Sequence, residues 1–302
     1  MKYIDFNYQE HHFVGHLVME ENHNHHAVVV IMGGEKGILP GKKIAERFAD
    51  HHFIGLSVSL FGAEGLPDSP DQVDLGMFET AIDYLRNTIK AEKISVYGMS
   101  MGSIFASLIA VYLGNIENLI LVSPTHVPFE GTKKDRKTMT DHSVAIYKGK
   151  EIPYIRADFS QYKAKKYSRV KGLDYEVMGM WQAYNEAYQN KEAVELASLP
   201  IEKTHSRILM ICGEYDEAWP SRISVEYMEA RLKDHPYDHK VIIYPKGSHL
   251  IGMMPSKEKN KLLYHCLPLI KIMYKSFGLD IHRSMEYFQK SENEIIHFLN
   301  LL

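Results

Sequence analysis

From residue 27 onward the sequence alternates between short apolar segments of strand length and longer segments with apolar residues at helical spacing. The first apolar segment, 27–32, contains no polar residue and ends at Gly33, which is typical of a strand covered on both faces of a parallel sheet. Alternation of this kind predicts a doubly wound, mostly parallel α/β sheet. The pattern predicts further strands over 53–60, 94–97, 119–122, 207–212 and 240–244, and helices over 41–50, 71–90, 104–113, 222–233 and onward to the end of the chain.

Two segments depart from this alternation. Residues 3–18 contain two apolar stretches around a polar turn at 9–10, which predicts an N-terminal hairpin ahead of the first core strand. Residues 125–200 show no strong strand pattern and interrupt the alternation. We therefore expect a single domain over residues 1–302, with a cap inserted at about 125–200.

The composition excludes several classes of protein. Hydrophobic residues make up 45% of the 302 residues and charged residues 24%, which is ordinary for a globular chain, and the formal net charge of -3 argues against nucleic-acid binding. No stretch approaches the length of a membrane span, and charged residues interrupt the N-terminal segment, so we expect neither a membrane helix nor a signal peptide. Two cysteines, Cys212 and Cys266, cannot build a disulfide framework or a cysteine-based metal site, and we expect a cytoplasmic protein.

The turn after the predicted strand 94–97 reads G-M-S-M-G over residues 98–102. G-x-S-x-G between a strand and a helix is the nucleophile turn of α/β-hydrolases, where the serine occupies a strained bend and the glycines allow close backbone approach. The motif predicts Ser100 as a nucleophile and the N–H of Met101 as an oxyanion donor. The alternative is a glycine-rich turn without chemistry, because the bare motif arises often by chance.

A serine nucleophile needs a base and an orienting acid, and in α/β-hydrolases these follow it in the order acid, then histidine. Two acids, Glu214 and Asp216, follow the predicted strand 207–212, and His249 follows the predicted strand 240–244. Sites in open α/β sheets form just past the carboxyl ends of strands, where all three residues are expected. We predict Asp216 as the acid, with Glu214 as the competitor, and His249 as the base.

The second oxyanion donor is expected in the loop after the first core strand. The N–H of Gly34 is favoured and that of Glu35 is the alternative, while a flexible turn without a role is the bland interpretation. Among 17 histidines, His23, His25 and His26 resemble a metal cluster, but they have no nearby partner at ligand spacing. We predict no metal and no cofactor.

Several segments carry a resemblance to a known family. The chain resembles, from about residue 27 to its end, the C-terminal α/β-hydrolase domain shared by acyl-CoA thioesterases and bile acid-CoA:amino acid N-acyltransferase. The resemblance implies the same three site residues, Ser100, Asp216 and His249. It rests on the Gly33-Gly34 loop and on segments 66–67, 78–81, 98–102, 147–153, 201–203, 213–221 and 244–250, of which G-x-x-D-x-x-W-x-S at 213–221 is the most specific.

The chain departs from the family pattern in two places. Family members from animals carry a β-sandwich domain before the hydrolase domain, whereas only about 26 residues precede the first core strand here, so the resemblance does not extend to any specificity given by that domain. The amino-acid-conjugating transferases use a cysteine nucleophile, whereas this chain has Ser100. An ester acyl-enzyme favours water over amines more than a thioester does, so the serine favours hydrolysis.

The expected cap is strongly basic, with 12 basic and 4 acidic residues over 131–171 and interleaved tyrosines. Such a cap is able to steer an anionic ligand such as coenzyme A; the alternative is a solvated lysine-rich loop. Taken together, the sequence predicts a serine hydrolase that cleaves a small-molecule thioester or ester through an acyl-enzyme. The alternatives are a carboxylesterase on esters without coenzyme A and, less favoured, an acyl-CoA N-acyltransferase; neither nucleic acid nor membrane is an expected partner.

Overall fold

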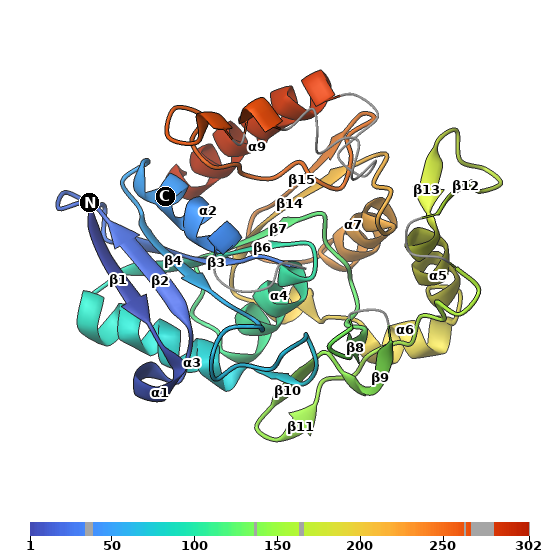
Figure 1. Cartoon of the computed structure of the whole chain (residues 1–302), viewed down its shortest axis with the longest axis horizontal. Helices are drawn as coiled ribbons and strands as arrows, with labels where there is room; N and C mark the ends of the chain where they lie inside the picture. Colours follow the sequence, from blue (N-terminus) through green and yellow to red (C-terminus); the bar gives the residue numbers. More distant parts are fainter. Residues whose placement is uncertain (34–38, 136–137, 163–165, 263, 267–280, 302) are drawn as a thin grey trace.

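The computed structural model describes residues 1–33, 39–135, 138–162, 166–262, 264–266 and 281–301 (Figure 1). Within these residues the core is an eight-stranded sheet in the order β1-β2-β4-β3-β6-β7-β14-β15. The strands are β1 (Lys2–Phe6), β2 (Gly15–Met19), β3 (His26–Ile31), β4 (Ile54–Val58), β6 (Lys93–Met99), β7 (Asn118–Val122), β14 (Arg207–Gly213) and β15 (His239–Tyr244).

Six of these strands, from β4 to β15 in the sheet order, run parallel, while β1 and β2 form the antiparallel edge. The register places Val29 of β3 between Leu56 of β4 and Val96 of β6. All three side chains are fully buried, because helices cover both faces of the sheet. The predicted α/β-hydrolase fold, with its antiparallel N-terminal strands, is confirmed.

Within the described residues, helices pack against both faces of the sheet (Figure 1). On one face, Phe48 of α2 and Phe298 of α9 share a hydrophobic cluster with alternate residues of the central strands. On the other, Phe78 of α3, Phe105 of α4 and Val225 of α7 belong to the second cluster. The helices are α2 (Leu39–Ala49), α3 (Gly76–Tyr84), α4 (Gly102–Tyr112), α7 (Ser221–Arg231) and α9 (Ile281–Asn300). Among the described helices, none combines the length and apolar character needed to cross a membrane.

Residues 125–200 contain more regular structure than their sequence predicts. Among the described residues of this segment there are six short strands and two helices. Each strand has five residues or fewer, which is too short for a period-two pattern to stand out. The elements are β8 (Glu130–Thr132), β9 (Met139–Ser143), β10 (Ala145–Tyr147), β11 (Lys150–Glu151), β12 (Tyr167–Arg169), β13 (Glu176–Met178), α5 (Gly179–Ala187) and α6 (Lys191–Ala197), followed by the single 3-10 turn η2 (Ile201–Lys203).

Two boundaries differ from the predicted ones. The long helix expected over 71–90 is preceded by β5 (Val73–Asp74), which pairs in parallel with β10, and its last turn is the π-helical segment η1 (Leu85–Ile89). The turn expected between β1 and β2 is a short helix, α1 (Tyr8–His11), capped by the side chain of Asn7. Both differences come from contacts and caps that hydrophobic periodicity does not record.

Candidate active site

Ser100 occupies the bend between β6 and α4 with a φ of 57°, in the left-handed region that a non-glycine residue seldom adopts. The neighbouring glycines are needed because the backbones are too close for a side chain. A Cβ on Gly98 would lie 2.5 Å from the carbonyl oxygen of Gly102, and one on Gly102 would lie 2.1 Å from that of Ile31. The motif therefore adopts the strained turn that exposes a serine hydroxyl at the carboxyl end of the sheet.

His249 connects Ser100 to Asp216. Nε2 of His249 lies 2.9 Å from Oγ of Ser100, and Nδ1 lies 2.9 Å from Oδ2 of Asp216. Because a carboxylate only accepts, Nδ1 carries the proton and Nε2 is free to accept the serine hydroxyl. The structure thus brings together the three residues predicted from three separate strand ends.

The side chains of Asp216 and Glu214 have different surroundings. The carboxylate of Asp216 is almost fully buried, and its Oδ1 accepts the main-chain N–H groups of Ala218 at 2.9 Å and Trp219 at 3.2 Å. Glu214 instead pairs with Arg222 at 3.3 Å and accepts the N–H of Lys246 at 3.0 Å. The geometry therefore favours Asp216 as the partner of the histidine.

The loops that carry the acid and the histidine are held together by Ser123 and Trp219. The Ser123 hydroxyl donates to the carbonyl oxygen of His249 at 2.6 Å, and the Trp219 indole N–H donates to the carbonyl oxygen of Ser123 at 3.0 Å. The Trp219 ring also meets the imidazole edge-on, with 5.6 Å between centroids. These contacts fix the orientation of the imidazole ring.

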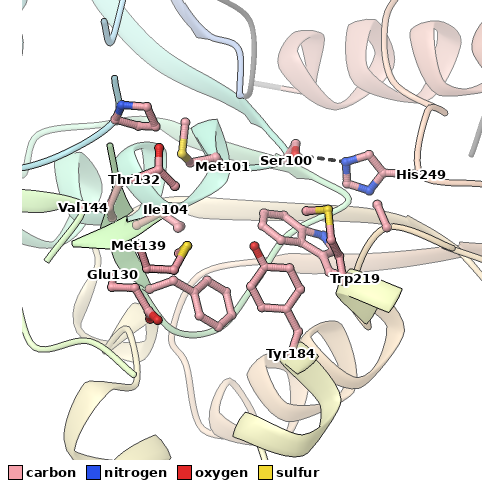
Figure 2. A pocket seen from close by; sticks show the side chains of 14 residues that line it. Ser100, Met101, Ile104, Glu130, Thr132, Met139, Val144, Tyr184, Trp219 and His249 are labelled. Carbon is pink, nitrogen blue, oxygen red and sulfur yellow. Dashed lines mark hydrogen bonds between the residues drawn. The ribbon is translucent and has the colours of Figure 1, made fainter. Parts of the chain in front are cut away.

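A pocket with a volume of about 190 Å³ opens beside Ser100 and His249 (Figure 2). Its walls come from the sheet edge, from α4 and, for half of the lining, from residues 125–200. Most of the lining side chains are apolar, so the pocket suits the apolar part of a small substrate. The lining residues are Pro70, Ser100, Met101, Ile104, Phe129, Glu130, Thr132, Met139, Val144, Met180, Tyr184, Ala218, Trp219 and His249.

Of the predicted oxyanion donors, only Met101 lies within the described residues. Met101 immediately precedes α4, so its N–H is at the amino end of that helix, where partial positive charge gathers. A Cβ on Gly33 would lie 2.8 Å from the Met101 nitrogen, so the end of β3 and the nucleophile turn are in close contact. Gly34 and Glu35 lie outside the described residues.

The remaining predicted features lie away from the pocket. No lysine or arginine from the described part of 131–171 belongs to the pocket lining. Two of these residues form exposed ion pairs instead: Lys134 with Asp68, and Arg156 with Asp141, each at 3.0 Å. The lining therefore gives no support to steering of an anionic ligand by these charges.

Only two of the three clustered histidines have rings in contact with each other. The rings of His23 and His25 contact each other, with 4.6 Å between centroids, whereas His26 is buried and bonds to Ser95 at 2.7 Å. Within the described ranges, no group of three or more histidine, cysteine, aspartate or glutamate side chains converges as metal ligands would.

Comparison with known proteins adds to this geometry. Residues 73–260 match the family described as BAAT / Acyl-CoA thioester hydrolase C terminal, and the match covers more than half of the chain. The chain belongs to this family. The matched region includes Ser100, Asp216, His249 and the whole of residues 125–200.

Individual members of the family are distant. Human acyl-coenzyme A thioesterase 6 is 24% identical over 229 residues, covering 74% of this chain and 48% of that protein. Mouse acyl-coenzyme A amino acid N-acyltransferase 2 is 26% identical over 211 residues, covering 68% and 45%, respectively. The chain thus spans about half the length of these relatives, which include both thioesterases and acyltransferases.

Solved structures with a similar fold are more distant still. Est1E from Butyrivibrio proteoclasticus is 17% identical with a TM-score of 0.43, over 82% of this chain and 89% of that one. The acylaminoacyl peptidase of Pyrococcus horikoshii is 14% identical with a TM-score of 0.47, over 90% and 42%.

Proposed function

We propose that the protein is a serine hydrolase that cleaves a small acyl thioester or ester through an acyl-enzyme on Ser100. The observation that carries this proposal is the continuous hydrogen-bonded chain from Ser100 through His249 to Asp216 beside an apolar pocket. Membership of a family of acyl-CoA thioester hydrolases supports a thioester as the substrate. The free thiols of Cys212 and Cys266 support a cytoplasmic location, which is also a proposal.

In the acylation step, Oγ of Ser100 attacks the acyl carbonyl while its proton moves to Nε2 of His249. The tetrahedral oxyanion is stabilised by the N–H of Met101 and, in our proposal, by that of Gly34. His249 then returns the proton to the departing thiol or alcohol, leaving an ester on Ser100. Asp216 keeps the imidazole in the required tautomer and stabilises its charged form.

In deacylation, His249 takes a proton from water, and the resulting hydroxide attacks the ester carbonyl. The carboxylic acid leaves, and the proton returns from His249 to the oxygen of Ser100. The same base therefore serves both halves of the reaction. No metal and no organic cofactor has a step in this scheme.

Labelling with a fluorophosphonate tests the nucleophile. We expect the probe to attach to Ser100, and Ser100→Ala to lose both labelling and turnover of acyl-CoA and p-nitrophenyl esters. Ser103→Ala is the matched control, because this buried serine is three residues further along and does not line the pocket. Wild-type turnover by Ser100→Ala would rule out the proposed mechanism.

The product ratio distinguishes hydrolysis from acyl transfer, which the acyltransferase relatives make the second candidate function. The ester on Ser100 is less reactive toward amines, relative to water, than a thioester on cysteine, so we expect free acid as the main product with millimolar glycine or taurine present. Ser100→Cys should slow hydrolysis and raise the fraction of any amide formed. Predominant amide from the native protein, measured by mass spectrometry, would make it an acyltransferase.

A further inference from the structure

The pocket beside Ser100 has polar groups at its far end. Figure 2 shows Glu130, from β8, at the opposite end of the view from Ser100, with Tyr184, from α5, between them. Both residues line the pocket, and neither has a part in the acyl-transfer scheme. They lie where the distal end of a bound acyl group would be.

The carboxyl group of Glu130 is buried, with only 6% of the residue exposed, and the charge of Arg156 acts on it without forming an ion pair among the described residues. Both of its oxygens accept the same N–H, that of Ala157, at 3.1 Å each. Within the described part of the chain no lysine, arginine or histidine nitrogen lies within ion-pair distance of it. Burial raises the pKa of this carboxyl group. Two oxygens offer about four acceptor positions, so capacity is left for a donor from the pocket.

The hydroxyl of Tyr184 is the complementary group. Its ring is fixed by aromatic contacts with Phe129, Phe159 and Trp219, at centroid distances of 4.4, 5.2 and 5.7 Å. Figure 2 shows the hydroxyl directed into the pocket, and it makes no hydrogen bond to another residue of the described ranges. Burial raises the pKa of this phenol, so it remains a donor at neutral pH.

The volume of the pocket limits the size of the group that enters it. A cavity of about 150 Å³ accommodates benzene in an engineered protein, so the 190 Å³ found here suits an acyl group of roughly six to eight non-hydrogen atoms. A long-chain acyl group would extend beyond this space.

We propose that the pocket selects a short acyl group that carries a hydroxyl at its distal end. The hydroxyl donates to Glu130 and accepts from Tyr184, which leaves both buried groups hydrogen-bonded. A purely aliphatic acyl group would leave them without a partner in an apolar pocket, at a cost in binding. An ammonium group could donate to both oxygens, but it would lose its hydration on entering the pocket. This inference rests on the proposed hydrolase function.

Three thioesters test the inference: the N-acetylcysteamine thioesters of hexanoic acid and of its ω-hydroxy and ω-amino derivatives. For the native protein we expect kcat/KM to be about tenfold higher for the ω-hydroxy compound than for hexanoyl, the effect of one good hydrogen bond to a carboxylate. In Glu130→Gln and in Tyr184→Phe the ratio of the two values should fall toward one. Tyr154→Phe is the control, because this tyrosine belongs to the same insertion but does not line the pocket, and it should keep the tenfold ratio.

Each variant is checked for folding by circular dichroism and for active sites by fluorophosphonate titration, so that the ratio is read only from folded protein. If Glu130→Gln fails to fold, Tyr184→Phe alone decides. Equal kcat/KM values for the hexanoyl and ω-hydroxy thioesters, a preference for the ω-amino compound, or a ratio unchanged in a folded Glu130 or Tyr184 variant would overturn the inference while Ser100 is still labelled. Failure of the proposed function has a different pattern, in which Ser100 is not labelled and no thioester is consumed.

Discussion

Replacement of Asp216 by asparagine should abolish most of the activity without disturbing the fold. The Oδ1 position accepts two main-chain N–H groups, so the amide oxygen of the new side chain must occupy it. The amide NH₂ then faces Nδ1 of His249, which has to become an acceptor and transfer its proton to Nε2. In that tautomer the imidazole no longer accepts the proton of Ser100.

The expected loss is about 10⁴-fold in kcat, the size of the effect of a wrong histidine tautomer in a serine protease, or about 5.4 kcal/mol of transition-state stabilisation. The assay is p-nitrophenyl ester hydrolysis, measured on samples that circular dichroism shows to be folded. Glu214→Gln is the control, because this carboxylate lies two residues away and pairs with Arg222 instead, and it should stay within about threefold of the native kcat. An Asp216→Asn protein with more than a tenth of native kcat, or an equal loss in Glu214→Gln, would refute the assignment of the acid.

Three further predictions follow from contacts described above. Gly33→Ala places a Cβ 2.8 Å from the Met101 nitrogen, so it should displace the nucleophile turn and lower kcat/KM by about 100-fold. In the control Gly76→Ala the new Cβ would meet nothing closer than 3.4 Å, and kcat/KM should stay within about threefold of the native value. Burial lowers the pKa of His26 to about 4, below its ordinary 6.5, so between these pH values the unfolded chain binds a proton that the folded chain does not. The free energy of unfolding should therefore fall by up to about 3 kcal/mol as the pH drops from 6.5 to 4. Urea unfolding of His26→Gln should show a weaker pH dependence. Trp219→Phe removes an indole N–H that satisfies a buried carbonyl and should cost about 1–3 kcal/mol of unfolding free energy, and no change in the urea midpoint would contradict this.

The central sheet could be predicted because its strands are continuous apolar runs. Strand β3, with Val28, Val29 and Val30, is buried on both faces and leaves little choice of structure. The segment 125–200 could not be predicted in the same way. Its strands β8 and β10 have three residues each, and β10 pairs with β5, which is distant in the sequence.

The candidate site could be predicted as far as the order of its residues along the sequence allowed. The strand ends predicted Ser100, Asp216 and His249, with Glu214 as the competitor for the acid. The choice between the two acids depends on hydrogen bonds to Arg222 and to main-chain N–H groups, which side-chain type alone does not determine. The polar end of the pocket was not predicted at all, because Glu130 and Tyr184 are 54 residues apart and belong to segments without periodicity.

Half of the pocket wall comes from a single continuous stretch, residues 125–200, whereas the three hydrogen-bonded side chains stand on loops that follow β6, β14 and β15. In evolutionary terms, the hydrogen-bonded residues and half of the pocket wall belong to separate parts of the chain. Relatives that share these loops could therefore differ in substrate through changes in residues 125–200 alone. Such changes would have to preserve the short parallel pairing of β10 with β5, which attaches this stretch to the segment before α3. We expect a chimera of this chain that carries residues 125–200 of a distant relative to acquire that relative's acyl preference. It would keep Ser100, Asp216 and His249.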